Sequence, residues 1–120
     1  MPLKHALLQL VEHVPEALGA ILVDWEGEAV EQVSRIDEFE LKVIGAHKGV
    51  ILCSMREIVA RLGGDTLEEI LVATAQTQTL MLPVTNDYFL IFTFAQRESL
   101  GLALFEARRC VLQLREEILR

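Results

Sequence analysis

Hydrophobic and polar positions along this 120-residue chain follow two periods, which together predict three helices and five strands. Apolar residues recur at helical spacing in residues 3–14, 37–62 and 100–119. Glycine, proline or Asn-Asp turns separate the short apolar runs of strand type, which occupy residues 20–24, 28–33, 66–74, 79–84 and 88–95. Because most strands are joined by short turns, we expect one antiparallel sheet with helices on its faces. This is an α+β sandwich of two or three layers with the order α-β-β-α-β-β-β-α.

Single residues mark several ends of these elements. Ser99 has the side chain of a helix N-cap directly before the last helical segment. Gly63 and Gly64 suit the end of the middle helix. Pro83 has no backbone N–H to donate, so the fourth strand should end there or lie at a sheet edge. The turn before that strand is expected at residues 76–78.

The middle helix is apolar on both of its sides. The stripe that we expect to face the core is broad and carries Ile36, Phe39, Val43, His47, Val50, Ile51, Met55 and Ile58. Two glycines on the opposite side cost about 1 kcal/mol each relative to alanine, and small residues four apart let another backbone approach closely. We therefore interpret that side as a contact surface for another chain, with a covering loop of the same chain as the alternative. Its residues are Leu41, Gly45, Gly49, Leu52, Cys53 and Ala60.

The last helix also has more apolar surface than one core stripe requires. The stripe expected to face the core carries Leu100, Ala103, Leu104, Ala107, Val111, Leu114 and Ile118. A neighbouring face is widened by four further apolar residues, Leu102, Phe105, Leu112 and Leu119.

Composition favours a single, self-associating domain over residues 1–120. A chain of this length has room for one core, and 52% of its residues are hydrophobic, with a mean hydropathy of +0.35. Association with itself or a partner is the simplest way to cover so much apolar surface. No segment reaches the ~18 uninterrupted apolar residues of a membrane span, and the first residues lack a secretory signal pattern. We therefore expect a cytoplasmic protein.

The net charge argues against two classes of partner, and the positions of the cysteines argue against a disulfide. The net charge of −7 argues against nucleic acid and against anionic membrane as main partners. Cys53 and Cys110 lie far apart in helical segments, so we expect buried thiols rather than a disulfide.

The sequence offers no clear catalytic or metal-binding group. Residues 63–65 lack the spacing of a phosphate-binding loop, and the three histidines share no metal-ligand spacing with one another or with the cysteines. Neighbouring acidic pairs such as residues 68–69 and 116–117 point apart in a helix or strand, which favours solvated charges over an acid/base pair. We therefore expect a protein that is not an enzyme, has no cofactor and no metal, and acts through its surface.

Several stretches of sequence carry a resemblance to a known family. They are residues 19–24 with Gly27, residues 70–72 leading to residues 82–84, and residues 88–95 followed by residues 100–102 and 106–109. In this order they resemble the roadblock/dynein light chain family, whose small domains are similar in fold to longin and profilin-like domains. The motifs are structural and cover nearly the whole chain, so the resemblance specifies the fold better than the role.

The resemblance implies a dimer and a partner. Family members form homodimers or heterodimers through the middle helix and the third strand, and here the homodimer interface would comprise Leu41, Gly45, Gly49, Leu52, Arg56, Leu67, Glu69 and Leu71. Members commonly serve as platforms for small Ras-like GTPases, and bacterial or archaeal ones resemble regulators of a cell-polarity GTPase. The expected GTPase-binding residues lie on the middle helix beside the dimer contact: Glu38, Lys42, Lys48 and Arg56.

Two other functions stay open. One is a structural scaffold subunit of a larger complex without a GTPase. The other is a small-molecule sensor domain, because related sandwich folds hold ligands between sheet and helix. The lack of convergent buried polar residues counts against the sensor.

Overall fold

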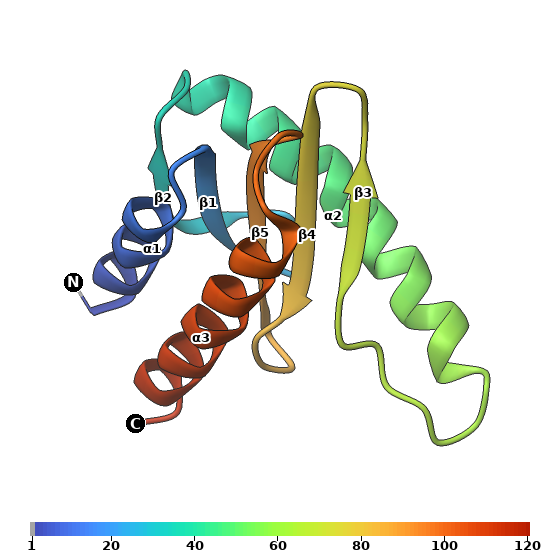
Figure 1. Ribbon diagram of the computed structural model, residues 1–120. Coiled ribbons are helices and arrows are strands. Elements are labelled where there is room, and N and C mark those ends of the chain that lie inside the picture. The colour runs from blue at the N-terminus through green and yellow to red at the C-terminus, as the bar shows by residue number, and fades with distance from the viewer. Residues whose placement is uncertain (1) are drawn as a thin grey trace.

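The computed structural model describes residues 2–120, apart from the side chains of Glu38, Phe39 and Lys48. Within this part of the chain, three helices sandwich one sheet in three layers (Figure 1). Helices α1 (Pro2–His13) and α3 (Leu100–Ile118) cover one face, and α2 (Glu38–Ala60) crosses the other. Two hydrophobic clusters fill the spaces between the layers, and the expected α+β sandwich is confirmed in its three-layered form.

The described residues form a five-stranded sheet with the order β2-β1-β5-β4-β3, in which every neighbouring pair is antiparallel. β5, the most apolar strand, lies at the centre between β1 and β4, whereas β2 and β3 are the edges. The element order agrees with the order predicted from the sequence. The strands are β1 (Ala17–Asp24), β2 (Ala29–Ser34), β3 (Ile70–Ala73), β4 (Thr77–Pro83) and β5 (Tyr88–Ala95).

Most element ends agree with the sequence signals. The Ser99 side chain accepts a hydrogen bond from the Leu102 N–H at 3.3 Å and caps α3, and Pro83 ends β4. Gly63 and Gly64 follow α2 with positive φ. The third strand is shorter than expected because residues 65–69 do not join the sheet. The predicted turn at residues 76–78 is wrong, because the turn lies between Thr74 and Thr77, where the Thr74 N–H donates to the Thr77 carbonyl oxygen at 2.8 Å.

The orientation of α2 is the reverse of the prediction. Leu41 and Leu52 are fully buried and pack into the cluster between α2 and the sheet, so they are not on an outward contact surface. A Cβ atom added at Gly45 would lie 2.9 Å from Ile21 Cδ1 of the sheet. One added at Gly49 would lie 3.3 Å from a carbon of the Phe89 ring. The two glycines therefore allow α2 to approach the sheet of its own chain.

Most of the stripe that the sequence assigned to the core faces away from the sheet. Ile36, just before α2, does pack against the cluster between α2 and the sheet, and the side chain of Phe39 lies outside the described residues. Val50 is 67% exposed and Ile58 is 50% exposed, and His47 is exposed as well. Val43, Ile51 and Met55 are each more than a third exposed on the same side. We call Val43, Val50, Ile51, Met55 and Ile58 the outer α2 face.

Helix α3 faces the sheet as predicted. Ala103, Ala107, Val111 and Leu114 are buried in the cluster shared with α1, β4 and β5. The additional apolar residues of this helix, and Leu119 at its C-terminal cap, remain exposed: Leu102, Phe105, Leu112 and Leu119. In the described part of the chain, no helix is both long and apolar enough to cross a membrane.

Candidate functional site

The outer α2 face and the adjacent edge strand form the candidate interaction site. β3 packs Ile70 and Val72 against the α2 layer, while Leu71 is 40% exposed on the other side of the strand. Within residues 2–120, β3 pairs only with β4, so its outer edge presents unpaired backbone groups. An exposed apolar helix face beside an open sheet edge suits association with another chain.

The segment before β3 is held to α3 by a predicted interface residue. Arg108 Nε donates a hydrogen bond to Glu69 Oε2 at 3.1 Å, and a second guanidinium nitrogen bonds the other carboxylate oxygen. These bonds lower the pKa of Glu69 below its ordinary value. Their contribution to stability is therefore present above the ordinary pKa of the carboxyl and is lost as the pH falls through the lowered pKa. Leu67, also expected at the interface, is half-buried and packs against the α2 cluster.

Arg56 makes its main contact within the chain. Its guanidinium lies 4.0 Å from the centre of the Trp25 ring, and that ring packs on Phe89 with centroids 4.6 Å apart. A cation over an indole face is attracted by the negative face of the ring. The stack was not predicted, although the single Trp in the first hairpin was a signal for it. Arg56 therefore fastens α2 to the β1–β2 turn.

The four expected GTPase-binding residues are not equally placed. Lys42 is exposed and borders a hollow of about 340 Å³ between α2 and the β1–β2 hairpin, next to Gly27 and Glu28. Arg56 is half-buried under its contact with Trp25. The side chains of Glu38 and Lys48 lie outside the described residues. Lys42 is thus the predicted contact residue whose described side chain is most available to a partner.

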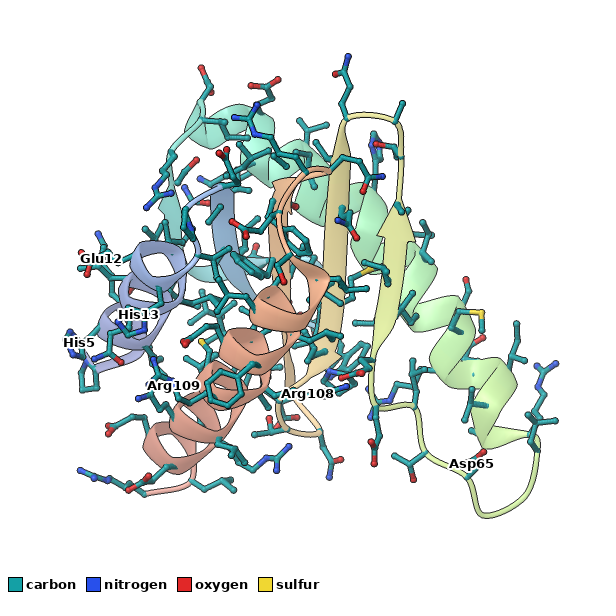
Figure 2. The ribbon with its side chains drawn as sticks, viewed as in Figure 1. His5, Glu12, His13, Asp65, Arg108 and Arg109 are labelled. Atoms are coloured by element: carbon teal, nitrogen blue, oxygen red, sulfur yellow. The ribbon has the colours of Figure 1, made fainter. Side chains whose placement is uncertain are left out.

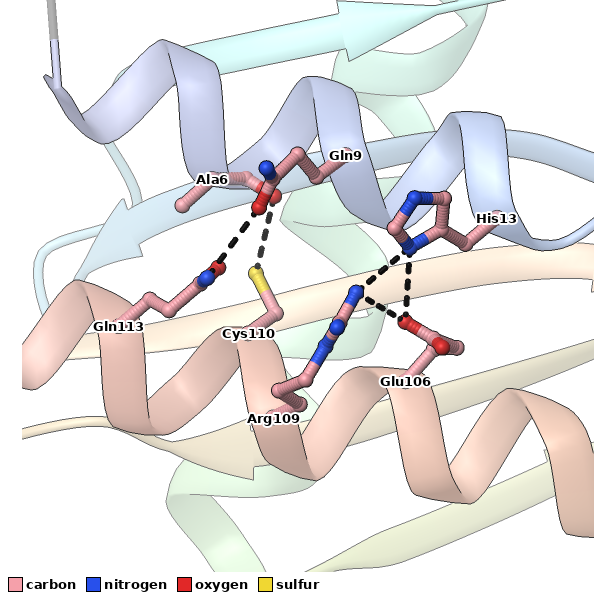
Figure 3. A network of polar contacts seen from close by, with 7 residues as sticks. All are labelled: Ala6, Gln9, His13, Glu106, Arg109, Cys110 and Gln113. Atoms are coloured by element: carbon pink, nitrogen blue, oxygen red, sulfur yellow. Dashed lines mark hydrogen bonds and ion pairs between the residues drawn. The ribbon is translucent and has the colours of Figure 1, made fainter.

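A polar network joins α1 to α3 (Figure 3). Glu106 is buried, and its Oε2 lies 3.2 Å from His13 Nδ1 and 2.8 Å from Arg109 Nη2. Further along, Gln113 donates to Gln9 at 3.2 Å. These contacts neutralise a buried carboxylate and align two helices, which is a structural role. Among the described residues, no cluster of three or more His, Cys, Asp or Glu could hold a metal ion.

The two cysteines are free thiols in different environments. Burial raises the pKa of the Cys110 thiol to about 12, and its Sγ lies 3.5 Å from the Ala6 carbonyl oxygen. Cys53 on α2 is only half-buried.

Thiol labelling should distinguish them. Because the thiolate is the reactive form, Cys110 stays protonated and unreactive at pH 8 in the folded chain. Treatment with 5,5′-dithiobis(2-nitrobenzoate) is expected to label one thiol per chain in the native protein and two after denaturation. Cys53→Ser should abolish the native signal, and rapid labelling of two native thiols would contradict the burial of Cys110.

Comparisons with known proteins agree on one fold. The Roadblock/LC7 domain family model matches residues 3–94. The fold is similar to that of MglB from Myxococcus xanthus, with a TM-score of 0.87 and 16% identity, covering 97% of this chain and 94% of that chain. It is similar to MglC from the same organism, with a TM-score of 0.72 and 23% identity, covering 98% and 99%. Acanthamoeba castellanii profilin IA also matches, with a TM-score of 0.62 and 10% identity, covering 95% and 97%. No curated protein sequence matches the chain.

Proposed function

We propose, because the chain belongs to the Roadblock/LC7 domain family, that it is a non-catalytic dimeric platform for a small Ras-like GTPase. The observation that carries this proposal is the outer α2 face, an exposed apolar surface next to an open strand edge. Such a surface suits protein partners better than small substrates, which bind in concave pockets with a few convergent polar groups.

The proposed dimer contact uses the outer α2 face and the edge of β3. Two copies related by a two-fold axis would place α2 against α2 and β3 beside β3, which extends the sheet and covers both exposed features. Val50, Ile51 and Ile58 are the proposed helix contacts, and Leu71 is the proposed strand contact. The proposed contact uses the same helix and strand as the interface expected from the sequence. On the helix, however, residues of the opposite face take the place of Leu41, Gly45, Gly49 and Leu52.

The GTPase proposal rests on the family and on the polar residues around this contact. Roadblock-like domains commonly act as platforms for small Ras-like GTPases, as the resemblance in the sequence implied. The described structure offers Lys42 as an exposed cation near the start of α2, at the hollow beside the β1–β2 hairpin. A platform of this kind acts by binding one conformation of the GTPase more tightly than another, without donating a catalytic residue.

Affinity capture from the cell lysate of origin tests the partner. The tagged chain is incubated with lysate containing GDP or a non-hydrolysable GTP analogue, and captured proteins are identified by mass spectrometry. A small GTPase enriched in one nucleotide state supports the proposal. A stable complex without a GTPase would instead support the scaffold alternative.

Charge reversal at Lys42 should reduce capture of the GTPase several-fold without changing the fold or the dimer, because the side chain is exposed and outside the core. The matched control is Lys4→Glu on α1, an equal charge change on the opposite layer of the sandwich, which should leave capture unchanged. Equal capture by the wild type and both variants would show that Lys42 is not at the contact.

A further inference from the structure

Helix α3 carries a second exposed apolar surface, separate from the outer α2 face. Phe105, Leu112 and Leu119 recur at intervals of seven residues and are 63%, 62% and 70% exposed. They lie on the side of α3 opposite the buried Ala103 and Ala107. A seven-residue spacing places side chains along one line of a helix, which is the pattern of a contact with another helix. We call these three residues the α3 ridge.

A groove runs along one flank of the α3 ridge. Leu112 and Leu119 form part of one wall of this hollow of about 780 Å³, and Leu67 with Glu68 belongs to the other wall. Leu82 and Val84 at the end of β4 also line it. The lining of the groove is mixed, with leucine and valine side chains among charged and polar ones. A ridge with a large aromatic side chain next to such a groove is self-complementary, because each feature can receive the other from a second molecule.

We propose that the α3 ridge and this groove bind a second copy of this chain, with the two α3 helices antiparallel about a two-fold axis near Leu112. In this arrangement Leu112 meets its own counterpart, and Phe105 lies beside Leu119 of the second copy. Phe105 then enters the groove next to that leucine. Each contact occurs twice, as in an isologous interface.

The antiparallel direction follows from the position of the groove, because only then does Phe105 lie beside Leu119, which lines the groove of the second copy. The flanking charges are compatible with this direction. Figure 2 shows Arg109 on the side of α3 toward α1 and Arg108 on the side toward β3. Glu116 follows Arg109 by seven residues and therefore shares its flank. A two-fold axis across the helices brings equal flanks together, so Arg109 lies opposite Glu116 of the second copy. Within its own chain Arg109 also bonds Glu106 at 2.8 Å, and Glu116 lies 3.6 Å from Arg120. A parallel pair would instead bring unlike flanks together, with Arg109 near Arg108 and Glu116 near Arg115 of the second copy.

The charges on the other flank, on the side of α3 toward β3, are compatible with this arrangement. It carries Arg108 and Arg115, but Arg108 is paired with Glu69, and Arg115 Nε donates to the Val84 carbonyl oxygen at 2.9 Å. Glu68 lies in the wall of the same groove. In total α3 contains three arginines and three glutamates, whereas the chain has a net charge of −7. Two copies can therefore approach through α3 without the repulsion that the rest of the acidic surface imposes.

The α3 contact is independent of the proposed α2 contact. α2 and α3 lie on opposite faces of the sheet (Figure 1), so one chain can use both surfaces at once. The chain should then form species larger than a dimer.

Sedimentation velocity of the full chain from about 5 to 200 µM tests the proposal. We expect Leu112→Glu to lose one association step relative to the wild type, because two glutamates would meet at the two-fold axis. If the α2 contact also exists, the variant stops at the dimer; if it does not, the variant is a monomer. Phe105→Ala should shift the same step to at least ten-fold higher concentration.

Val30→Glu is the matched control, since Val30 is an exposed valine on β2, away from both surfaces. It should assemble as the wild type does. Circular dichroism checks that each variant is folded. We expect both α3 variants to fold, because Leu112 and Phe105 are exposed and their replacement leaves the core intact. Identical sedimentation of the wild type and Leu112→Glu at every concentration would overturn the proposal.

Cysteine cross-linking tests the direction of the helices, in a Cys53→Ser background so that the buried Cys110 is the remaining native thiol. Under mild oxidation, Leu112→Cys is expected to give a disulfide-linked dimer, because equivalent residues face each other at the axis. Phe105→Cys should not link to itself in the antiparallel pair. Absence of the link at position 112, or an equally efficient link at position 105, contradicts the proposed arrangement.

Discussion

Truncation of Leu52 to alanine is expected to lower the free energy of unfolding by about 2–5 kcal/mol, the usual cost of removing a buried leucine side chain. Leu52 has no exposed surface and packs between α2 and the sheet with Met81, Phe89 and Ile91. Removal of its side chain leaves a cavity that the neighbouring rings and branched side chains cannot fill without moving. This is the change on α2 that most directly tests which side of the helix faces the sheet.

The adjacent residue provides the matched control. Ile51 is 40% exposed on the outer α2 face, so Ile51→Ala should cost the isolated chain less than about 1 kcal/mol. Urea unfolding at two protein concentrations separates the two effects, since loss of a dimer contact gives a concentration-dependent change and loss of core packing does not. A larger loss at Ile51 than at Leu52, independent of concentration, would show that α2 faces the sheet with its other side.

Local patterns in the sequence predict the elements well. The continuous apolar run of β5, the Ser99 cap and the core stripe of α3 each act within a few neighbouring residues, and the structure contains all three. The third strand is over-extended in the prediction because Leu67 is apolar, yet it packs on the α2 cluster from a segment that is not part of the sheet. The apolar character of this residue therefore predicts that it packs on the core, but it does not predict whether its backbone is hydrogen-bonded into the sheet.

The orientation of α2 could not be predicted in the same way. Both sides of the helix are apolar, and the side with the larger residues, including Val50 and Ile58, looked more like a core stripe. The correct side contains two glycines because Ile21 and Phe89 of the sheet fill the space where their side chains would lie. The glycines do permit a close contact, but it is made by side chains of the sheet of the same chain and not by the backbone of another chain. A helical pattern alone does not say which of two apolar sides meets which neighbour.

The contacts that hold the candidate site together are also long-range. Arg56 stacks on Trp25, and Glu69 pairs with Arg108, and the partners lie 31 and 39 residues apart in the chain. No periodicity links such residues, because their proximity follows from the strand order rather than from local spacing. Both were therefore predicted as free interface residues, whereas their charged groups are already engaged within the chain.

Glutamates at Val50 and Ile58 together are expected to raise the dissociation constant of the α2 dimer by a factor of about 100 or more. Both residues belong to the outer α2 face and are at least half exposed in the single chain, so they add little to its own core. In an isologous contact each substitution occurs twice, and a carboxylate placed in an apolar contact without a partner is costly to desolvate. About 3 kcal/mol lost in this way corresponds to a hundred-fold weaker dimer.

The measurement is best made in a Leu112→Glu background, so that the proposed α3 contact does not mask the result. The parent is the Leu112→Glu protein. In sedimentation from low to high micromolar concentration, the parent should dissociate at a much lower concentration than the double glutamate variant. Val30→Glu, made in the same background, should behave as the parent does. At concentrations low enough for the Leu112→Glu protein to be monomeric as well, the double glutamate variant should have the same thermal stability, because Val50 and Ile58 are exposed in the single chain. If the variant is a monomer and no longer captures a GTPase, the partner recognises the dimer rather than one chain. If the variant dissociates at the same concentration as the parent, self-association uses another surface.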